Sequence, residues 1–163
     1  DAMLYFLNDQ VVEVTSYSVK SKKEIFAPYE YDPTSVTICK FKDGAVGKIS
    51  TSIEANCPYT FNIVLMGDKG TIRNNQYYGD KCLGTYGHPE LGQGQTSWVT
   101  WPTILPDSGD VKHHPFFGEI DHLVDCIIND TEPMLSIPRS KHTHDVCFAA
   151  DKSAKTGRPV QLV

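Results

Sequence analysis

The sequence predicts an α+β domain in which helices pack on one face of a mostly antiparallel, open-faced β-sheet. Strand-like runs fill the first half of the chain and helix-like runs fill the last third, an order typical of this class. The Asp43-Gly44 pair lies between two such strand-like runs and tolerates the positive φ angles of a type I′ hairpin turn. With 163 residues, the chain is long enough for one domain with an ordinary core.

The first strands are indicated by β-branched residues and turn signals. Residues 1–7 are apolar from the second position and resemble the end of a helix or another buried element. Residues 11–17 predict a strand, and residues 35–41 and 45–53 predict the two arms of the hairpin. A natural N-terminus seldom begins inside a hydrophobic element, so we expect the chain to be a piece of a longer protein.

Further strands are predicted in the middle of the chain. Residues 59–66 alternate between an apolar face and a mixed face, and the mixed face carries Val64 and Met66. A glycine-bounded turn then leads into a short returning strand. Residues 75–112 contain six glycines and little periodicity, and within them only residues 97–101 resemble a strand. A loop region of this length inside a domain is more often functional than decorative.

Two helices are predicted near the C-terminus. Residues 115–129 place apolar side chains at three- and four-residue steps, the pattern of an amphipathic helix. A second helix is expected from about Pro138 to Gly157, because proline suits a first helical turn and glycine suits the C-terminal cap. Its small residues would let it lie close against a sheet. Residues 160–163 can add a terminal strand.

The composition excludes several classes of protein. The formal net charge is −5, whereas a nucleic-acid or acidic-membrane surface would need clustered cations. The longest apolar run has six residues, too few to span a bilayer. The five cysteines form no Cys-x-x-Cys pair, which argues against zinc ribbons and redox motifs. We interpret them as buried thiols of an intracellular, cytoplasmic protein.

No complete active site is recognisable from the residues alone. His142 and His144 would point about 200° apart on a helix and cannot grip one ion together. Glu119 and His122 supply one carboxylate–imidazole motif where a di-iron bundle needs two. The Gly-x-Gly at residues 92–94 lacks the third glycine of a dinucleotide fingerprint. We therefore expect no metal site and no cofactor site within this chain.

Five short motifs follow one another in a definite order along nearly the whole chain. They are residues 1–7 with residues 11–14, Phe41-Lys42-Asp43-Gly44-Ala45-Val46-Gly47, Met66-Gly67-Asp68-Lys69-Gly70-Thr71-Ile72, Pro115-Phe116-Phe117-Gly118-Glu119-Ile120-Asp121-His122-Leu123, and Asp151-Lys152-Ser153-Ala154-Lys155-Thr156-Gly157-Arg158-Pro159-Val160-Gln161-Leu162. Together they resemble the C-terminal domain of the glucose–fructose oxidoreductase / inositol dehydrogenase / MocA (Gfo/Idh/MocA) family of NAD(P)-dependent oxidoreductases. The implied fold is a dihydrodipicolinate-reductase-like C-terminal domain.

This resemblance implies a substrate-binding and oligomerisation domain over residues 1–163, with the N-terminal Rossmann domain absent from this chain. NAD or NADP would bind that Rossmann domain in the full-length protein, and none is expected in this fragment. The family's catalytic Lys lies in the Rossmann half, and its catalytic Asp and His lie just before residue 1. No catalytic residue is therefore expected in this chain, and the fragment alone should be inactive. The implied reaction oxidises a hydroxyl of a sugar, polyol or cyclitol, or runs in reverse.

Four positions are expected to line the substrate pocket. Asp1 corresponds to the last residue of the family's Gly-x-His-x-x-Asp pattern, an acid that can hydrogen-bond a substrate hydroxyl. Tyr59 lies where some polyol-oxidising members place a tyrosine facing the substrate, and it is equally consistent with an aromatic residue on the apolar face of the sheet. Asn56 and His113 are weighed as further hydroxyl partners against ordinary loop roles.

The expected partners are the chain's own Rossmann domain, a small-molecule sugar or polyol substrate and further copies of the chain. A dimer or tetramer would form through the mixed face of the sheet, because Val64 and Met66 there need a covering surface. No nucleic acid and no membrane is expected. The alternative is a free-standing dimerisation or carbohydrate-binding module without catalysis.

Overall fold

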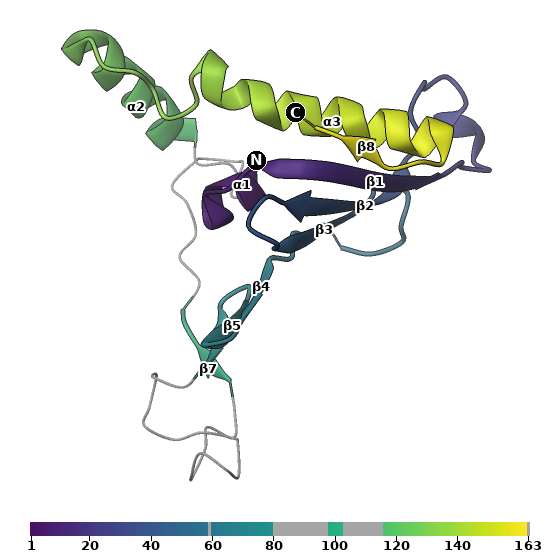
Figure 1. The fold of residues 1–163 in the computed structure, drawn as a ribbon, viewed down its shortest axis with the longest axis horizontal. Coiled ribbons are helices and arrows are strands. Elements are labelled where there is room, and N and C mark those ends of the chain that lie inside the picture. Colours follow the sequence, from purple (N-terminus) through teal and green to yellow (C-terminus); the bar gives the residue numbers. More distant parts are fainter. Residues whose placement is uncertain (59, 80–97, 103–115, 163) are drawn as a thin grey trace. The chain divides into compact units, whose positions relative to one another are not determined.

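The computed structural model describes residues 1–58, 60–79, 98–102 and 116–162 (Figure 1). The chain divides into two compact units, residues 1–56 with 123–163 and residues 57–122. The first unit combines the beginning and the end of the chain, so its core depends on contacts between residues far apart in sequence.

The first unit contains a four-stranded antiparallel sheet, here called sheet A, in the order β3-β2-β1-β8. Its strands are β1 (Val11–Val19), β2 (Thr34–Phe41), β3 (Val46–Ser52) and β8 (Val160–Gln161). β2 and β3 form the predicted hairpin, and Gly44 in its turn has a φ of 95°, a region that favours glycine. The hairpin prediction is confirmed, but the predicted type I′ turn is wrong, because that turn needs a positive φ at both central residues and Asp43 does not have one.

Helices cover one face of sheet A. α3 (Ile137–Thr156) runs along β1, and α1 (Ala2–Leu7) lies next to the start of that strand (Figure 1). A short 3₁₀ helix, η1 (Glu24–Phe26), follows β1. Proline occupies the first turn of α3, and Gly157 ends the helix in the left-handed conformation with a φ of 66°. Both ends of the second predicted helix are confirmed.

The core of the first unit lies between α3 and sheet A. Its buried members come from β1, β2 and α3: Val11, Val14, Cys39, Phe41 and Ala149. Met3 and Leu4 of α1 pack against this cluster. A Cβ atom at Gly47 of β3 would lie 2.5 Å from the Met3 sulfur, so the small residue lets α1 approach the sheet.

A buried pair of serines links α3 to β1. β8 pairs only with Glu13 and Val14, and the backbone N–H of Ser16 instead donates to the Ser153 hydroxyl oxygen at 2.9 Å. The Ser16 hydroxyl lies 2.8 Å from that of Thr37 on β2. Ser153 is fully buried. Its hydroxyl therefore satisfies a strand N–H beyond the end of β8.

The opposite face of sheet A, here called the outer face, is partly apolar. The strand register places Tyr17, Val36, Ile38 and Val46 on it, away from α3. All four side chains are exposed, Val46 to 68%. Such a face is typical of a surface that a partner covers.

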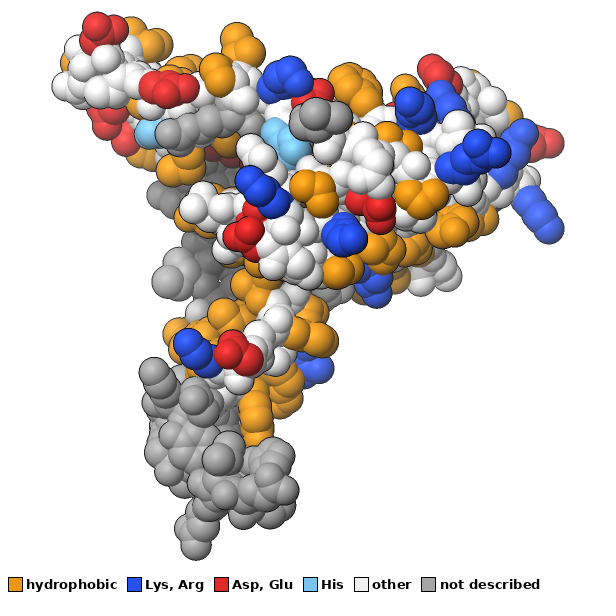
Figure 2. Space-filling model, viewed as in Figure 1, with side chains coloured by type: hydrophobic (Ala, Val, Ile, Leu, Met, Phe, Trp, Pro, Cys, Tyr) orange, Lys and Arg blue, Asp and Glu red, His pale blue; other side chains and the backbone are white. Residues whose placement is uncertain are grey.

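The second unit contains a separate antiparallel sheet, here called sheet B, in the order β4-β5-β6-β7. Its strands are β4 (Val64–Gly67), β5 (Gly70–Arg73), β6 (Gln76–Gly79) and β7 (Val99–Thr100). Hydrophobic side chains gather over β4 and β5 (Figure 2). The α+β class is confirmed, but the strands divide between two sheets.

The predicted strand over residues 59–66 is wrong in its first half. β4 begins only at Val64, and the backbone N–H of Ile63 donates to the side-chain oxygen of Asn74 at 2.9 Å instead of to a strand. The Asn74 amide in turn donates to Asn62 at 3.0 Å. These asparagine bonds replace a strand ladder. Tyr59 lies outside the described residues.

α2 (Phe116–Asn129) confirms the first predicted helix. Its apolar side chains remain exposed, and Cys126 is its buried residue in the part of the chain that is described. The exposed set comprises Phe117, Ile120, Leu123, Val124, Ile127 and Ile128. None of the helices in the described ranges is both long and apolar enough to cross a membrane.

The serine pair generates a stability prediction. Ser153→Ala removes the acceptor of a buried N–H, so we expect the free energy of unfolding to fall by about 1–3 kcal/mol. Ser140→Ala on the same helix is the control. The hydrogen bonds that Ser140 makes with described residues come from its backbone and not from its side chain. Urea unfolding followed by circular dichroism measures both. Equal effects of the two substitutions would contradict the role given to Ser153.

Candidate functional site

The structure describes two of the four residues predicted to line a substrate pocket. Asp1 is exposed and stands at the N-cap of α1. Asn56 is exposed in the bend that follows β3. Tyr59 and His113 lie outside the described residues. Both of these residues belong to the first unit, and the Asp1 side chain makes a hydrogen bond within it.

The Asp1 side chain turns toward α3 rather than toward its own helix. Its carboxylate oxygen Oδ1 accepts a hydrogen bond from the Thr143 hydroxyl at 3.2 Å. An aspartate at an N-cap usually accepts a backbone N–H of the first turn, but Asp1 makes no such side-chain bond. Its backbone carbonyl accepts the Tyr5 N–H at 3.0 Å, which starts the helix.

His142, next to Thr143, binds the other end of the segment that runs from Asp1 to the start of β1. Its Nε2 atom accepts the backbone N–H of Val11, the first residue of β1, at 3.0 Å. Because Nε2 is the acceptor, the neutral ring must carry its proton on Nδ1. α3 therefore binds residues 1 and 11 through two neighbouring side chains. Sequence reasoning missed both residues, because no local signal connects positions 142 and 131 residues apart.

The described histidines have other partners than a metal ion. His144 Nδ1 lies 2.8 Å from the backbone oxygen of Ser140, one turn earlier on α3. Within the described ranges, no group of three or more His, Cys, Asp or Glu side chains is arranged to hold an ion. His88, His113 and His114 lie outside those ranges.

The four described cysteines lie in two environments. Cys39 and Cys126 are buried, whereas Cys57 and Cys147 are exposed. Burial raises the pKa of the Cys39 thiol, so this residue stays protonated at neutral pH. A protonated, buried thiol is a packing residue rather than a nucleophile.

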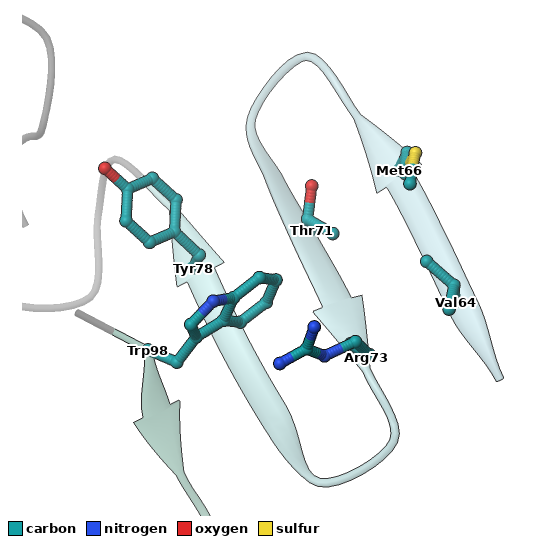
Figure 3. A pocket seen from close by; sticks show the side chains of 6 residues that line it. All are labelled: Val64, Met66, Thr71, Arg73, Tyr78 and Trp98. Atoms are coloured by element: carbon teal, nitrogen blue, oxygen red, sulfur yellow. The ribbon is translucent and has the colours of Figure 1, made fainter. Parts of the chain in front are cut away.

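Sheet B carries a groove that sequence reasoning did not predict. It has a volume of about 310 Å³ and lies on one face of the sheet. Val64 and Met66 of β4 stand on one side, Tyr78 and Trp98 on the other, and Thr71 and Arg73 of β5 lie between them (Figure 3). The groove combines an apolar wall with one cation.

Arg73 is held in place between the two sides of this groove. Its guanidinium carbon lies 4.8 Å from the centre of the Trp98 ring, within the range of a cation–π contact. Two of its N–H groups donate to the Gln76 side-chain oxygen, at 3.2 and 2.7 Å. The Tyr78 and Trp98 rings lie 5.9 Å apart and tilted by 59°. The groove wall is therefore ordered by its own side chains.

Comparison with known proteins identifies similar chains among oxidoreductases. A family model described as GFO/IDH/MocA C-terminal domain matches residues 1–73. The scyllo-inositol 2-dehydrogenase (NAD(+)) of Bacillus subtilis (strain 168) is 22% identical over 162 residues, which cover 99% of this chain and 44% of that protein. The chain thus spans less than half the length of this curated relative. The resemblance predicted from the motifs is confirmed.

Solved structures share the fold over nearly the whole chain. A myo-inositol 2-dehydrogenase from Lactobacillus plantarum has a TM-score of 0.70 at 18% identity, covering 99% of this chain and 45% of that one. An oxidoreductase from Agrobacterium radiobacter, in complex with NAD+, L-tartaric acid and magnesium, has a TM-score of 0.72 at 17% identity, covering 97% and 45%. At these identities the likeness shows the fold alone.

The cysteine environments predict selective alkylation. When the native protein is treated with iodoacetamide at neutral pH, Cys57 and Cys147 should react, and Cys39 should react at least about tenfold more slowly because it is buried and protonated. Peptide mass spectrometry measures each rate, and labelling in denaturant is the control in which the difference disappears. Fast labelling of Cys39 in the native protein would contradict its placement in the core.

Proposed function

We propose that this chain, of which residues 1–73 match the family model described as GFO/IDH/MocA C-terminal domain, is the substrate-binding and oligomerisation part of an NAD(P)-dependent oxidoreductase. The complete protein would oxidise a hydroxyl group of a sugar, polyol or cyclitol, or reduce the corresponding ketone. This chain would pack with the N-terminal Rossmann domain of the same protein, and that domain would bind NAD or NADP.

The proposal rests on how much of a known dehydrogenase this chain matches. The comparison with the B. subtilis dehydrogenase covers 99% of this chain but only 44% of that enzyme. A chain that corresponds almost completely to less than half of a dehydrogenase is consistent with one of its domains. The free thiols of Cys39, Cys57 and Cys147 fit a reducing, cytoplasmic location.

In this proposal the chain contributes the wall of the pocket, and the missing half contributes the chemistry. Asp1 would accept a hydrogen bond from a substrate hydroxyl, and Tyr59, Asn56 and His113 would be further hydroxyl partners. The lysine and histidine that move the proton would lie outside this chain. The nicotinamide cofactor supplies hydride chemistry when it is bound to the complete protein. This chain alone would bind and orient, and would not catalyse.

A cofactor titration tests this division of roles. The 163-residue chain should show no saturable binding of NADH, measured by nicotinamide fluorescence, because the dinucleotide site would lie in the other domain. The complete protein should bind NADH saturably and reduce NAD+ or NADP+ with a polyol such as myo-inositol. Stoichiometric NADH binding by the chain alone would contradict the proposal. A complete protein that binds no dinucleotide and oxidises no polyol would favour the non-catalytic dimerisation or carbohydrate-binding module.

The exposed sheet faces support the oligomer. On sheet B, Met66 is 83% exposed and Val64 is 45% exposed. The outer face of sheet A, defined above by four exposed side chains, is equally open. Apolar side chains on two open sheet faces are typical of surfaces covered by another copy. We therefore assign both faces to contacts between copies of the chain.

Charge substitutions test the two faces separately. Val36→Lys on sheet A and Met66→Lys on sheet B should each reduce the mass measured by light scattering, because a buried unpaired lysine opposes association. Ile25→Lys in η1 is the control: Ile25 is 72% exposed and lies on neither sheet. A strictly monomeric native protein at high concentration would contradict the oligomer, and an unchanged mass for one variant would exclude that face.

A further inference from the structure

Two neighbouring side chains of α3 hold both ends of the segment that runs from Asp1 to β1. Thr143 donates to the Asp1 carboxylate at 3.2 Å, and His142 accepts the Val11 backbone N–H at 3.0 Å. Between these two points lies α1, which ends at Leu7. The segment is therefore attached to one turn of α3 at its beginning and at its end.

The bond to Thr143 takes the place of the usual local partner of Asp1. An aspartate at an N-cap ordinarily accepts a backbone N–H two or three residues later, which stabilises the helix. Asp1 makes no such bond. Its carboxylate instead points to a helix that begins at Ile137. An orientation that gives up a local cap in favour of a distant hydroxyl needs a reason outside α1.

Packing makes the orientation rigid. Met3 and Leu4 of α1 and Val146 and Ala150 of α3 lie against the same buried core. α1 therefore cannot rotate freely about its own axis, and Thr143 lies on the side of α3 that meets residue 1. Among the described residues, Thr143 is the only side chain with a hydrogen bond to the Asp1 carboxylate. The second carboxylate oxygen, Oδ2, is left for another donor.

We propose that Thr143 is a positioning residue that orients the Asp1 carboxylate toward the substrate hydroxyl, with Oδ1 held by Thr143 and Oδ2 presented to the substrate. This inference rests on the proposed function, because it takes from it the role of Asp1 as a hydroxyl partner. Thr143 itself does not touch the substrate. His142 supports the same geometry by fixing the backbone at the start of β1.

Steady-state kinetics of the complete protein, with NAD+ and myo-inositol as the probe, tests the inference. Thr143→Val keeps the size of the side chain and removes its hydroxyl, so KM for the polyol should rise about tenfold while kcat changes little. Thr143→Ser should restore the native KM, because serine keeps the donor. A merely structural role would not separate KM from kcat in this way.

Matched variants complete the design. Thr156→Val is the control on the same helix, because the Thr156 hydroxyl donates to the Lys152 carbonyl at 2.7 Å and not to residues 1–11. It should leave both constants unchanged. Asp1→Asn should raise KM, and the double variant Asp1→Asn/Thr143→Val should be no worse than Asp1→Asn alone, because Thr143 acts through Asp1.

The outcomes separate the inference from the function on which it rests. A raised KM for Asp1→Asn with a native KM for Thr143→Val would overturn the inference and leave the proposed role of Asp1 standing. A Thr143→Ser variant as impaired as Thr143→Val would also overturn it. Native kinetics for Asp1→Asn would refute the role of Asp1, and the inference with it. A complete protein without polyol oxidation would refute the proposed function itself.

Discussion

The hydrogen bond from the Ser16 backbone N–H to the buried Ser153 hydroxyl brings α3 close against β1. Small side chains make this approach possible, since Ala149 and Ser153 are the residues of α3 buried against the sheet. The same approach closes the core over Val14 and Phe41. A larger residue at 149 or 153 would hold the helix away from the sheet and open a cavity in a tightly packed interior. The first unit therefore depends on how near one helix can come to one strand.

The close packing of α3 against β1 also fixes the arrangement of the candidate site. Because α3 is held along β1, its first turns meet the segment that precedes the strand, and His142 and Thr143 bond to Val11 and Asp1. One helix thus stabilises the core with its C-terminal half and orients a carboxylate with its N-terminal half. The proposed pocket wall is then a consequence of the packing of the core, and a rigid support for a binding group is what recognition of a hydroxyl requires.

Much of the local structure could be predicted from the sequence. The Asp43-Gly44 turn, the proline and glycine at the ends of α3 and the strand at residues 11–17 all follow from backbone preferences over a few residues. The predicted strand over residues 59–66 is wrong before Val64, because alternation of apolar residues is also compatible with an irregular segment, and here Asn74 and Asn62 supply the bonds that a strand would supply. The division into two sheets was not foreseen, since strand patterns carry no information about which edges pair.

Most helices and strands, the α+β class and the resemblance to an oxidoreductase domain could be read from the sequence, because turn chemistry, periodicity and short motifs act within a few residues of one another. The tertiary structure alone decided which side chains meet. The Thr143–Asp1 and His142–Val11 bonds join positions more than 130 residues apart. The Arg73–Trp98 contact joins positions 25 residues apart. Such pairs arise only when helices and sheets pack, because their geometry depends on the packing of the whole core and no local pattern encodes it.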